Sequence, residues 1–319
     1  MSERVIFHVD ANSAFLSWSA AYRVKVLGEE KDLRDVPSVV AGDRESRHSI
    51  ILAKSGPAKK YGIQTGEPLF QALEKCPNLE VIQPDYELYV EASRHFVAML
   101  RQFSPAVEQY SIDEAWVDMT GTERLWGAPR LAAEKMRRRI WEELGFTVNV
   151  GISSNKLLAK MAGDFEKPNK VHTLFPEEIG KKFWPLPVRD LFLVGAATEK
   201  KLNLLGIYTI GDLANTDVHV LKRRLGKHGE TIWHFANGRN ADMVAPEPAE
   251  NKGYSNSVTT ARDIATTADA HQVLLSLCET VAMRMRRDGK CGGCIRFPPR
   301  RPSTNQGKPH ARSMHEASF

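Results

Sequence analysis

Three carboxylates in the sequence have the types and positions that suit a divalent metal ion. Asp113 and Glu114 are adjacent within the segment YSIDEAWVDMT, residues 110–120, and Asp10 ends the first apolar run, VIFHVD. Clustered carboxylates repel one another and resist ionisation unless a cation balances them. Mg²⁺ prefers one or two carboxylates together with water and phosphate oxygens. The residues therefore suggest a magnesium site, and a polar hairpin turn is the alternative explanation of Asp113 and Glu114.

Two metal ions would give these acids a specific chemistry. Ions about 3.5–4 Å apart can activate an attacking hydroxyl and stabilise a leaving pyrophosphate oxygen. Phosphates also need cations, and four lysines stand in suitable segments: Lys59, Lys60, Lys160 and Lys167. A lysine near a triphosphate acts as a point charge on the developing negative charge. For each lysine taken alone, a solvated position on a helix face is the alternative.

The order of predicted elements explains how distant acids could meet. Without an insertion at 11–78, the first half reads as strand, helix, hairpin, helix, strand and helix, at 4–10, 85–103, 106–119, 128–144, 146–153 and 153–167. A Ser N-cap is expected for the last helix, which would end before Pro168. This order is typical of a ferredoxin-like βαββαβ sheet. Its first and third strands are antiparallel neighbours, so Asp10 is expected beside Glu114.

Residues 185–242 have a different character from the first half of the chain. They contain LFLVGAATEKKLNLLGIYTIGDLA and a weaker second copy, each typical of a helix, a Gly-bearing hairpin and a helix. Backbone N–H groups of such a hairpin at a helix N-terminus can bind a phosphate without reading sequence. Gly195 and Gly206 are the candidate glycines, and a plain antiparallel helix pair is the alternative. Tandem copies with clustered Lys/Arg favour binding to the DNA backbone.

The C-terminal quarter shows less order. Residues 244–253 are Pro-rich and polar, as in a linker, a strand is expected over 255–264 and an amphipathic helix over 268–289. Residues 297–319 have almost no apolar content and are expected to be disordered. The spacing of Cys291, Cys294, His310 and His315 falls within the range of zinc sites. Because the intervening segment lacks the apolar residues of a zinc finger, incidental placement is preferred.

Composition limits the possible classes of protein. The 319 residues are 42% apolar and 26% charged, as in ordinary globular proteins of two or more structural units. The net charge of +5 arises in residues 281–319, which hold nine Lys/Arg and two Asp/Glu. No apolar run is long enough to span a membrane, and the N-terminus does not resemble a signal peptide. Four unevenly spaced cysteines fit a reducing cytoplasm rather than a disulfide framework.

Four blocks together resemble the Y-family of translesion DNA polymerases, of the bacterial DinB/UmuC type. They are FHVDANSAF, YSIDEAWVDMT, GISSNK with AKMAGDFEKPN, and VGAATEKKLNLLGIYTIGDL, and the resemblance covers about residues 4–295. It implies template-directed DNA synthesis from deoxynucleoside triphosphates on primer-template DNA, by a bacterial cytoplasmic monomer. Low fidelity and lesion tolerance are implied by the resemblance only. A sliding clamp is an open question, because the usual terminal clamp-binding peptide is not seen.

The resemblance also implies a role for each matching residue. Asp10, Asp113 and Glu114 would bind two Mg²⁺ ions, with the backbone carbonyl of Ala11 as a further ligand. Phe15 occupies the steric-gate position against the sugar of the incoming nucleotide, where it would reject a ribose hydroxyl by a clash. The implied triphosphate ligands are Lys59 and Lys167, and the implied primer or DNA contacts are Ser111, Lys160, Gly195, Lys201, Gly206 and Arg262.

The family architecture implies an α+β or α/β multidomain fold with a right-hand shape. The expected parts are a palm at 1–10 and 81–168, fingers at 11–80, a thumb at 169–243, the linker, a partial little finger at 254–296 and the tail. Several positions depart from the family pattern, namely Asn12, Ala14, Ala53, Gly56, Lys59 and Leu193. Leu193 stands where the thumb hairpin usually has its first glycine. The resemblance stops near Cys294 or Ile295, which suggests an incomplete little finger.

Two other functions remain open from the sequence. The first is a DNA-binding protein whose synthesis is impaired by the incomplete little finger. The second is a structure-selective nuclease built from helix-hairpin-helix motifs and acidic clusters. The placement of Asp10, Phe15 and the Lys167-Pro168-Asn169 segment argues against the nuclease.

Overall fold

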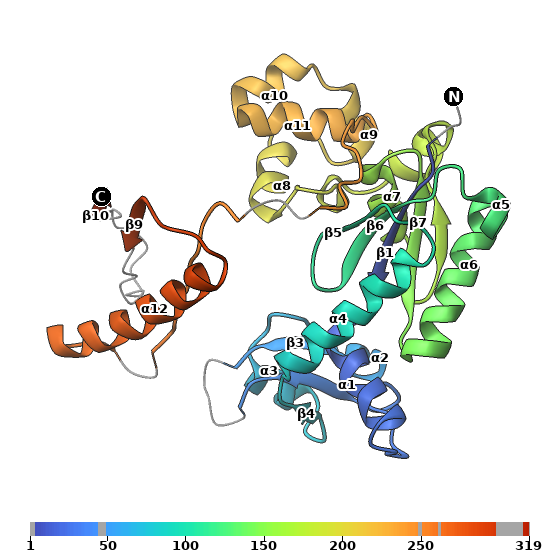
Figure 1. Ribbon diagram of the computed structural model, residues 1–319. Coiled ribbons are helices and arrows are strands. Elements are labelled where there is room, and N and C mark those ends of the chain that lie inside the picture. Colours follow the sequence, from blue (N-terminus) through green and yellow to red (C-terminus); the bar gives the residue numbers. More distant parts are fainter. Residues whose placement is uncertain (1–3, 44–48, 248–250, 261–262, 298–314, 319) are drawn as a thin grey trace. The chain divides into compact units, whose positions relative to one another are not determined.

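A computed structural model describes residues 4–43, 49–247, 251–260, 263–297 and 315–318. The chain divides into two compact units, Met1–Pro248 and Ala249–Phe319, which are described separately. Their boundary falls inside the expected linker. Figure 1 shows the helices and strands of both units along the chain.

A five-stranded sheet forms the centre of the first unit, in the order β5-β6-β1-β7-β8. Its strands are β1 (Ile6–Ala11), β5 (Val107–Gln109), β6 (Glu114–Asp118), β7 (Val148–Ser153) and β8 (Val171–Thr173). The first four pair antiparallel, in the ferredoxin-like order expected from the sequence, and β8 adds a parallel edge strand beside β7. The sequence analysis missed β8 because three residues carry too little periodicity to predict a strand.

Successive side chains of β1 point to opposite faces of the sheet, so the two faces pack against different helices. Phe7 and Val9 belong to the main core, which also contains buried residues of α4 (Tyr86–Arg101) and α6 (Pro129–Arg139). Ile6, on the other face, packs with residues that include Ala159 of α7 (Lys156–Gly163). His8 and Asp10 follow Ile6 at intervals of two, so they share the face covered by α7.

Helix α7 lies very close to the sheet at Gly151. A Cβ atom at this position would lie 2.0 Å from the carbonyl oxygen of Ala159 and 2.4 Å from the amide nitrogen of Gly163. Only glycine permits this approach of two backbones. The N-cap of α7 is Asn155, whose side chain accepts from the amide of Leu158 at 2.9 Å, so the expected Ser N-cap is wrong.

The helix expected over 128–144 is continuous but changes its hydrogen bonding. It comprises α6 and a π-helical segment, η1 (Ile140–Leu144), and it ends at Gly145 with φ 82°. The insertion after β1 contains a second, three-stranded sheet with its own apolar core. Its elements are α1 (Ala14–Lys25), β2 (Ser38–Ala41), β3 (Ile51–Lys54), α2 (Gly56–Lys60), α3 (Leu69–Lys75) and β4 (Glu80–Ile82).

The last part of the first unit contains two successive helix pairs. They are α8 (Ala196–Asn203) with α9 (Ile210–Asn215), and α10 (Val218–Leu225) with α11 (Lys227–Ala236). They enclose an apolar cluster that also includes Leu157, Leu158, Met161 and Ala162 of α7. Leu193, just before α8, has φ 72°, a left-handed conformation that costs a branched residue about 1 kcal/mol. Glycine adopts this conformation freely, and glycine is the residue that the resemblance led us to expect at this position.

The second unit contains α12 (Thr267–Arg287), β9 (Cys294–Phe297) and β10 (His315–Ser318). Strands β9 and β10 pair antiparallel, which differs from the expectation of a disordered tail for residues 315–318. The strand expected over 255–264 is wrong for the residues described there, which form no strand. His310 lies outside the described residues, so the zinc interpretation stays untested.

Candidate active site

The pairing of β1 with β6 brings the predicted acids to one edge of the sheet. Asp10 lies directly opposite Glu114 in the antiparallel register, as predicted. The amide of Ala11 donates to the carbonyl oxygen of Asp113 at 2.9 Å, which extends this pairing past the strand end. Residues about one hundred positions apart in sequence therefore meet because of the strand order.

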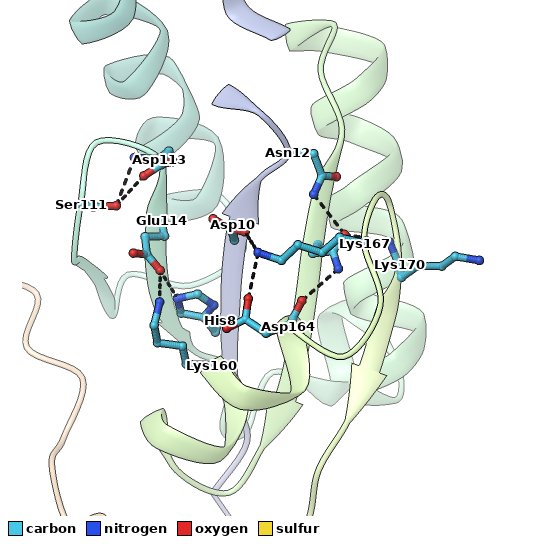
Figure 2. Close-up of polar contacts among 12 residues, drawn as sticks. His8, Asp10, Asn12, Ser111, Asp113, Glu114, Lys160, Asp164, Lys167 and Lys170 are labelled. Atoms are coloured by element: carbon cyan, nitrogen blue, oxygen red, sulfur yellow. Dashed lines mark hydrogen bonds and ion pairs between the residues drawn. The ribbon is translucent and has the colours of Figure 1, made fainter. Parts of the chain in front are cut away.

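Glu114 is held by two donors. Nε2 of His8 lies 2.8 Å from Oε2 of Glu114, and Nζ of Lys160 binds the same oxygen (Figure 2). Burial alone would raise the pKa of this carboxyl, but the hydrogen bonds from His8 and Lys160 outweigh it and lower the pKa to about 2. Burial also lowers the pKa of His8. Glu114 is therefore ionised, and His8 is neutral, at physiological pH.

Lys160 connects Glu114 to aromatic rings. Its Nζ lies 5.3 Å from the ring centre of Tyr110 and 5.5 Å from that of Phe192, which precedes α8. A cation over aromatic faces gains electrostatic energy, and more when little water reaches it. The side chain is only 14% exposed. Lys160 is thus fixed at the carboxylate from three sides.

Asp10 has a different environment from Glu114. Its Oδ2 pairs with Nζ of Lys167, which also lies 2.9 Å from Oδ1 of Asp164. Burial raises the pKa of Asp10 more than Lys167 lowers it. Burial would lower the pKa of Lys167, but the two carboxylates together raise it above its ordinary range.

Asp113 turns its side chain toward its own hairpin. Ser111 donates from Oγ to Oδ1 of Asp113 at 2.6 Å (Figure 2). Among the residues that the structure describes, no group of three or more His, Cys, Asp or Glu side chains is close enough to hold a metal ion. The three acids share one edge of the sheet, but their carboxylates bind protein donors instead of converging.

The donor set nevertheless fits a hard divalent cation. Each acid uses one oxygen for a protein donor: Oδ2 of Asp10, Oδ1 of Asp113 and Oε2 of Glu114. The second oxygen of each accepts no hydrogen bond within the described part of the chain. Oxygen ligands of this kind are those that Mg²⁺ prefers.

Comparison with known proteins identifies the family. A model of the impB/mucB/samB family matches residues 9–164, a model of the thumb domain of DNA polymerase iota matches residues 189–240, and a model of the impB/mucB/samB C-terminal domain matches residues 251–314. The chain belongs to the Y-family of DNA polymerases, of the DinB type. The C-terminal match runs past Ile295, where the resemblance was expected to stop.

Individual relatives agree with this assignment. A DNA polymerase IV of Clostridium acetobutylicum is 48% identical over 287 residues, which cover 90% of this chain and 72% of the relative. A DNA polymerase IV 2 of Bacillus subtilis is 37% identical over 300 residues, covering 92% and 71%. The crystal structure of DinB from Sulfolobus solfataricus shares the fold, with a TM-score of 0.64 and 24% identity over 75% of this chain and 69% of that one.

Phe15, the residue expected at a steric gate, lies in the first turn of α1. Its ring stacks on that of Tyr89, with centres 4.5 Å apart and planes 12° apart. Tyr89 is fully buried, and its hydroxyl lies 3.1 Å from Oγ of Ser19. The buried Tyr89 ring therefore fixes the orientation of the half-buried Phe15 ring that stacks on it.

The other predicted residues stay apart from the acids. Lys59 lies on α2 and Lys201 on α8, both exposed, and neither side chain has a hydrogen-bond or ion-pair partner among the residues described. Gly195 is the N-cap of α8, and Gly206 has φ 78°; a Cβ atom on either would meet no neighbour within 4 Å. Arg262 lies outside the described residues.

Sequence reasoning missed two polar residues at this site, His8 and Asn149. Asn149, fully buried on β7, donates to the carbonyl oxygens of Gly163 and Glu166 at 2.9 and 2.7 Å, so it holds the segment that leads to Lys167. Asn12 donates to Asn149 and accepts from the amide of Asn169, which makes it part of the same network. The available signals were a polar residue inside the apolar run VNV and a histidine two positions before Asp10.

Within the described ranges, no helix combines the length and apolar character needed to cross a bilayer.

Proposed function

We propose that this chain is a template-directed DNA polymerase of the translesion type. A primer 3′-hydroxyl would attack the α-phosphate of a deoxynucleoside triphosphate and release pyrophosphate. The observation that carries this proposal is the register of β1 and β6, which places Asp10 opposite Glu114 in a chain 48% identical to a DNA polymerase IV. Catalysis of this kind depends on positioning and on electrostatic stabilisation.

Asp10, Asp113 and Glu114, with the carbonyl oxygen of Ala11, would hold two Mg²⁺ ions. Such ions activate the attacking hydroxyl and stabilise the leaving oxygen. Asp113 would take part once its carboxylate leaves Ser111. Lys167 and Lys59 would bind the triphosphate, and Lys160 would keep Glu114 ionised beside the primer end.

The parts of the fold have corresponding roles in this proposal. The palm is formed by 1–10 and 81–168, the fingers by 11–80, the thumb by 169–243 and the partial little finger by 254–296, after the linker at 244–253. Ser111 would lie near the primer end, and Gly195, Lys201, Gly206 and Arg262 would contact the DNA. We propose a cytoplasmic monomer, which fits the small number of cysteines. Recruitment by a sliding clamp belongs to the same proposal.

A DNA-binding form with impaired synthesis is the second candidate. The observation that favours it is α12, in which the structure describes no buried residue although apolar side chains recur along it. A gripping domain without a packed core would hold DNA weakly.

The deciding experiment is single-nucleotide primer extension with Mg²⁺ on undamaged template, using this chain and its Asp113→Ala variant. We expect extension by the parent alone, with DNA binding by both, because the variant loses one metal ligand. Extension by Asp113→Ala at the parental rate would remove the metal assignment. DNA binding without extension by either protein would favour the second candidate.

The sugar selectivity tests Phe15 separately. Phe15→Ala removes the ring that faces the sugar edge, so we expect incorporation of ribonucleotides to rise by at least about 10-fold relative to deoxynucleotides. Competition between the two nucleotide types in the same extension reaction measures this ratio. The control is Phe70→Ala, at an exposed ring on α3. An unchanged ratio in Phe15→Ala would exclude a gate at this position.

A further inference from the structure

His8 makes one specific contact to the active-site edge. It lies on the central strand β1, two residues before Asp10 and on the same face, and it is only 2% exposed. Its ring lies 5.4 Å from that of Trp116 and faces the backbone of α7 at Gly163, where a Cβ atom would come within 3.5 Å of Nδ1. The ring is therefore enclosed by the sheet and by the helix that packs on it.

The chemistry of the contact determines which nitrogen carries the hydrogen. The ionised carboxylate of Glu114 can only accept, so Nε2 of His8 must donate. Nδ1 is buried and has no hydrogen-bond partner among the described residues. A bare lone pair is tolerated there more easily than a bare N–H donor. The imidazole thus makes a single hydrogen bond, and that bond goes to Oε2 of Glu114.

The second donor to Glu114 binds the same oxygen. Lys160 also reaches Oε2, so Oε1 has no protein partner within the described residues. The two donors are held in different ways: the imidazole is enclosed between β1 and α7, whereas Lys160 lies over the rings of Tyr110 and Phe192. The planar imidazole has a single N–H that points at the carboxylate, so it sets the direction from which Oε2 is bound.

We propose that His8 is a positioning residue that anchors Oε2 of Glu114 and presents Oε1 to a divalent cation. This inference rests on the proposed function of Glu114 as a metal ligand. Partners that hydrogen-bond to ligating carboxylates typically affect metal affinity or activity by about 10–100-fold. His8 does not touch the substrate or the ion, so it acts through Glu114 alone.

Two substitutions separate the hydrogen bond from the packing. His8→Phe keeps an aromatic ring in the same space but removes the donor. His8→Gln retains an N–H donor near the position of Nε2. We expect His8→Phe to weaken Mn²⁺ binding about 10-fold and His8→Gln to recover most of this loss. A purely structural role would not distinguish the two variants in this order.

The experiment measures Mn²⁺ affinity by the electron paramagnetic resonance signal of free Mn²⁺, with primer-template DNA and a non-hydrolysable deoxynucleoside triphosphate present. The control is His95→Phe, since His95 is exposed on α4. Parental Mn²⁺ affinity in His8→Phe, or equal losses in both folded variants, would overturn the inference. Nitrogen-15 NMR of the parent should show the Nε2-protonated tautomer of His8, and the Nδ1-protonated tautomer would overturn it without any substitution.

The same experiment distinguishes failure of this inference from failure of the proposed function. A parent that extends no primer and binds no Mn²⁺ contradicts the polymerase proposal itself. A parent that does both, with His8→Phe unchanged, contradicts only the role of His8.

Discussion

The two halves of the active-site edge contain the same groups but differ in their electrostatics. Asp10 with Lys167 and Glu114 with Lys160 are each a carboxylate and a lysine, and both carboxylate side chains are 16% exposed. The pKa of Glu114 is lowered to about 2, whereas the pKa of Asp10 is raised. Equal pairing with a lysine therefore does not shift the two pKa values in the same direction.

The two pKa values shift in opposite directions because the two carboxylates differ in the number of their donors, and because the donor to Asp10 also binds a second carboxylate. Glu114 receives Lys160 and also His8, and these two donors together exceed the cost of burial. Asp10 has Lys167 alone, and that lysine is 40% exposed and divided between Asp10 and Asp164. One shared, partly exposed cation does not offset the loss of water around a carboxylate. Lys167 is therefore the lysine that could exchange its carboxylate partners for a triphosphate, whereas Lys160 would remain bound to Glu114.

Of the changes that test this comparison, Lys167→Ala should have the largest effect. Removing the shared lysine removes positive charge that faces the proposed triphosphate, so kcat/KM for the nucleotide should fall about 100-fold, with a raised KM. Steady-state single-nucleotide extension gives both constants. Lys170→Ala is the matched control, because Lys170 lies three residues further on and pairs with Glu166 at 3.5 Å. An unchanged KM in Lys167→Ala would show that Lys167 does not bind the triphosphate.

A smaller effect is expected from Lys160→Met. The substitution keeps an unbranched apolar side chain and removes both the cation over the rings of Tyr110 and Phe192 and one donor to Glu114. Because this lysine acts through Glu114, kcat should fall about 10-fold while KM for the nucleotide stays near the parental value. Lys156→Met, one turn earlier and paired with Glu108 at 2.6 Å, serves as the control. A loss confined to KM would place Lys160 on the nucleotide instead.

The smallest effect concerns stability in acid, and its sign differs between the halves. The folded-state pKa of Glu114 is depressed, so its contribution is present above the unfolded-state pKa and is lost as the pH falls from about 4.5 toward 2. The pKa of Asp10 is raised, so its ionisation costs stability as the pH rises through that pKa. At pH 7, Glu114→Gln should lower the free energy of unfolding by about 2 kcal/mol, and Asp10→Asn should raise it slightly.

Denaturant unfolding at pH 7 and pH 3, with a chelator present, measures these changes. Glu114→Gln should also lose less stability than the parent on acidification, because the titrating group is gone. If Glu114→Gln and Asp10→Asn changed the free energy of unfolding in the same direction at pH 7, the proposed electrostatic difference between Glu114 and Asp10 would be wrong.

Much of the fold followed from local patterns. The strands β1, β6 and β7 were predicted from the sequence, and so were the helices α4, α6 and α12. The order of these elements then predicted a ferredoxin-like sheet and, through it, the pairing of Asp10 with Glu114. The three residues of β8 were not predicted, because so few residues carry little signal. The helix over 128–144 was predicted, but the π-helical hydrogen bonding of η1 within it was not.

Helices α7 and α12 show where local pattern stops being informative. Both helices were predicted from the sequence, yet α7 has six buried residues and α12 has none in the part that the structure describes. Backbone hydrogen bonds and side-chain spacing make a helix, but burial requires another surface against it. The spacing of apolar residues in α12 predicts which of its faces would be buried, but it does not predict the surface that would bury this face.

The sequence alone determined which residues could do chemistry: three oxygen-donor acids, an aromatic ring proposed as a steric gate, and several lysines. Tertiary structure decided how these residues are paired. Only the register of β1, β6 and β7 and the close packing of α7 at Gly151 put His8 and Lys160 on one oxygen of Glu114 and left Asp10 with a shared lysine. The reason is physical, because charge state depends on distances of a few ångströms between residues far apart in the chain, which no local pattern records.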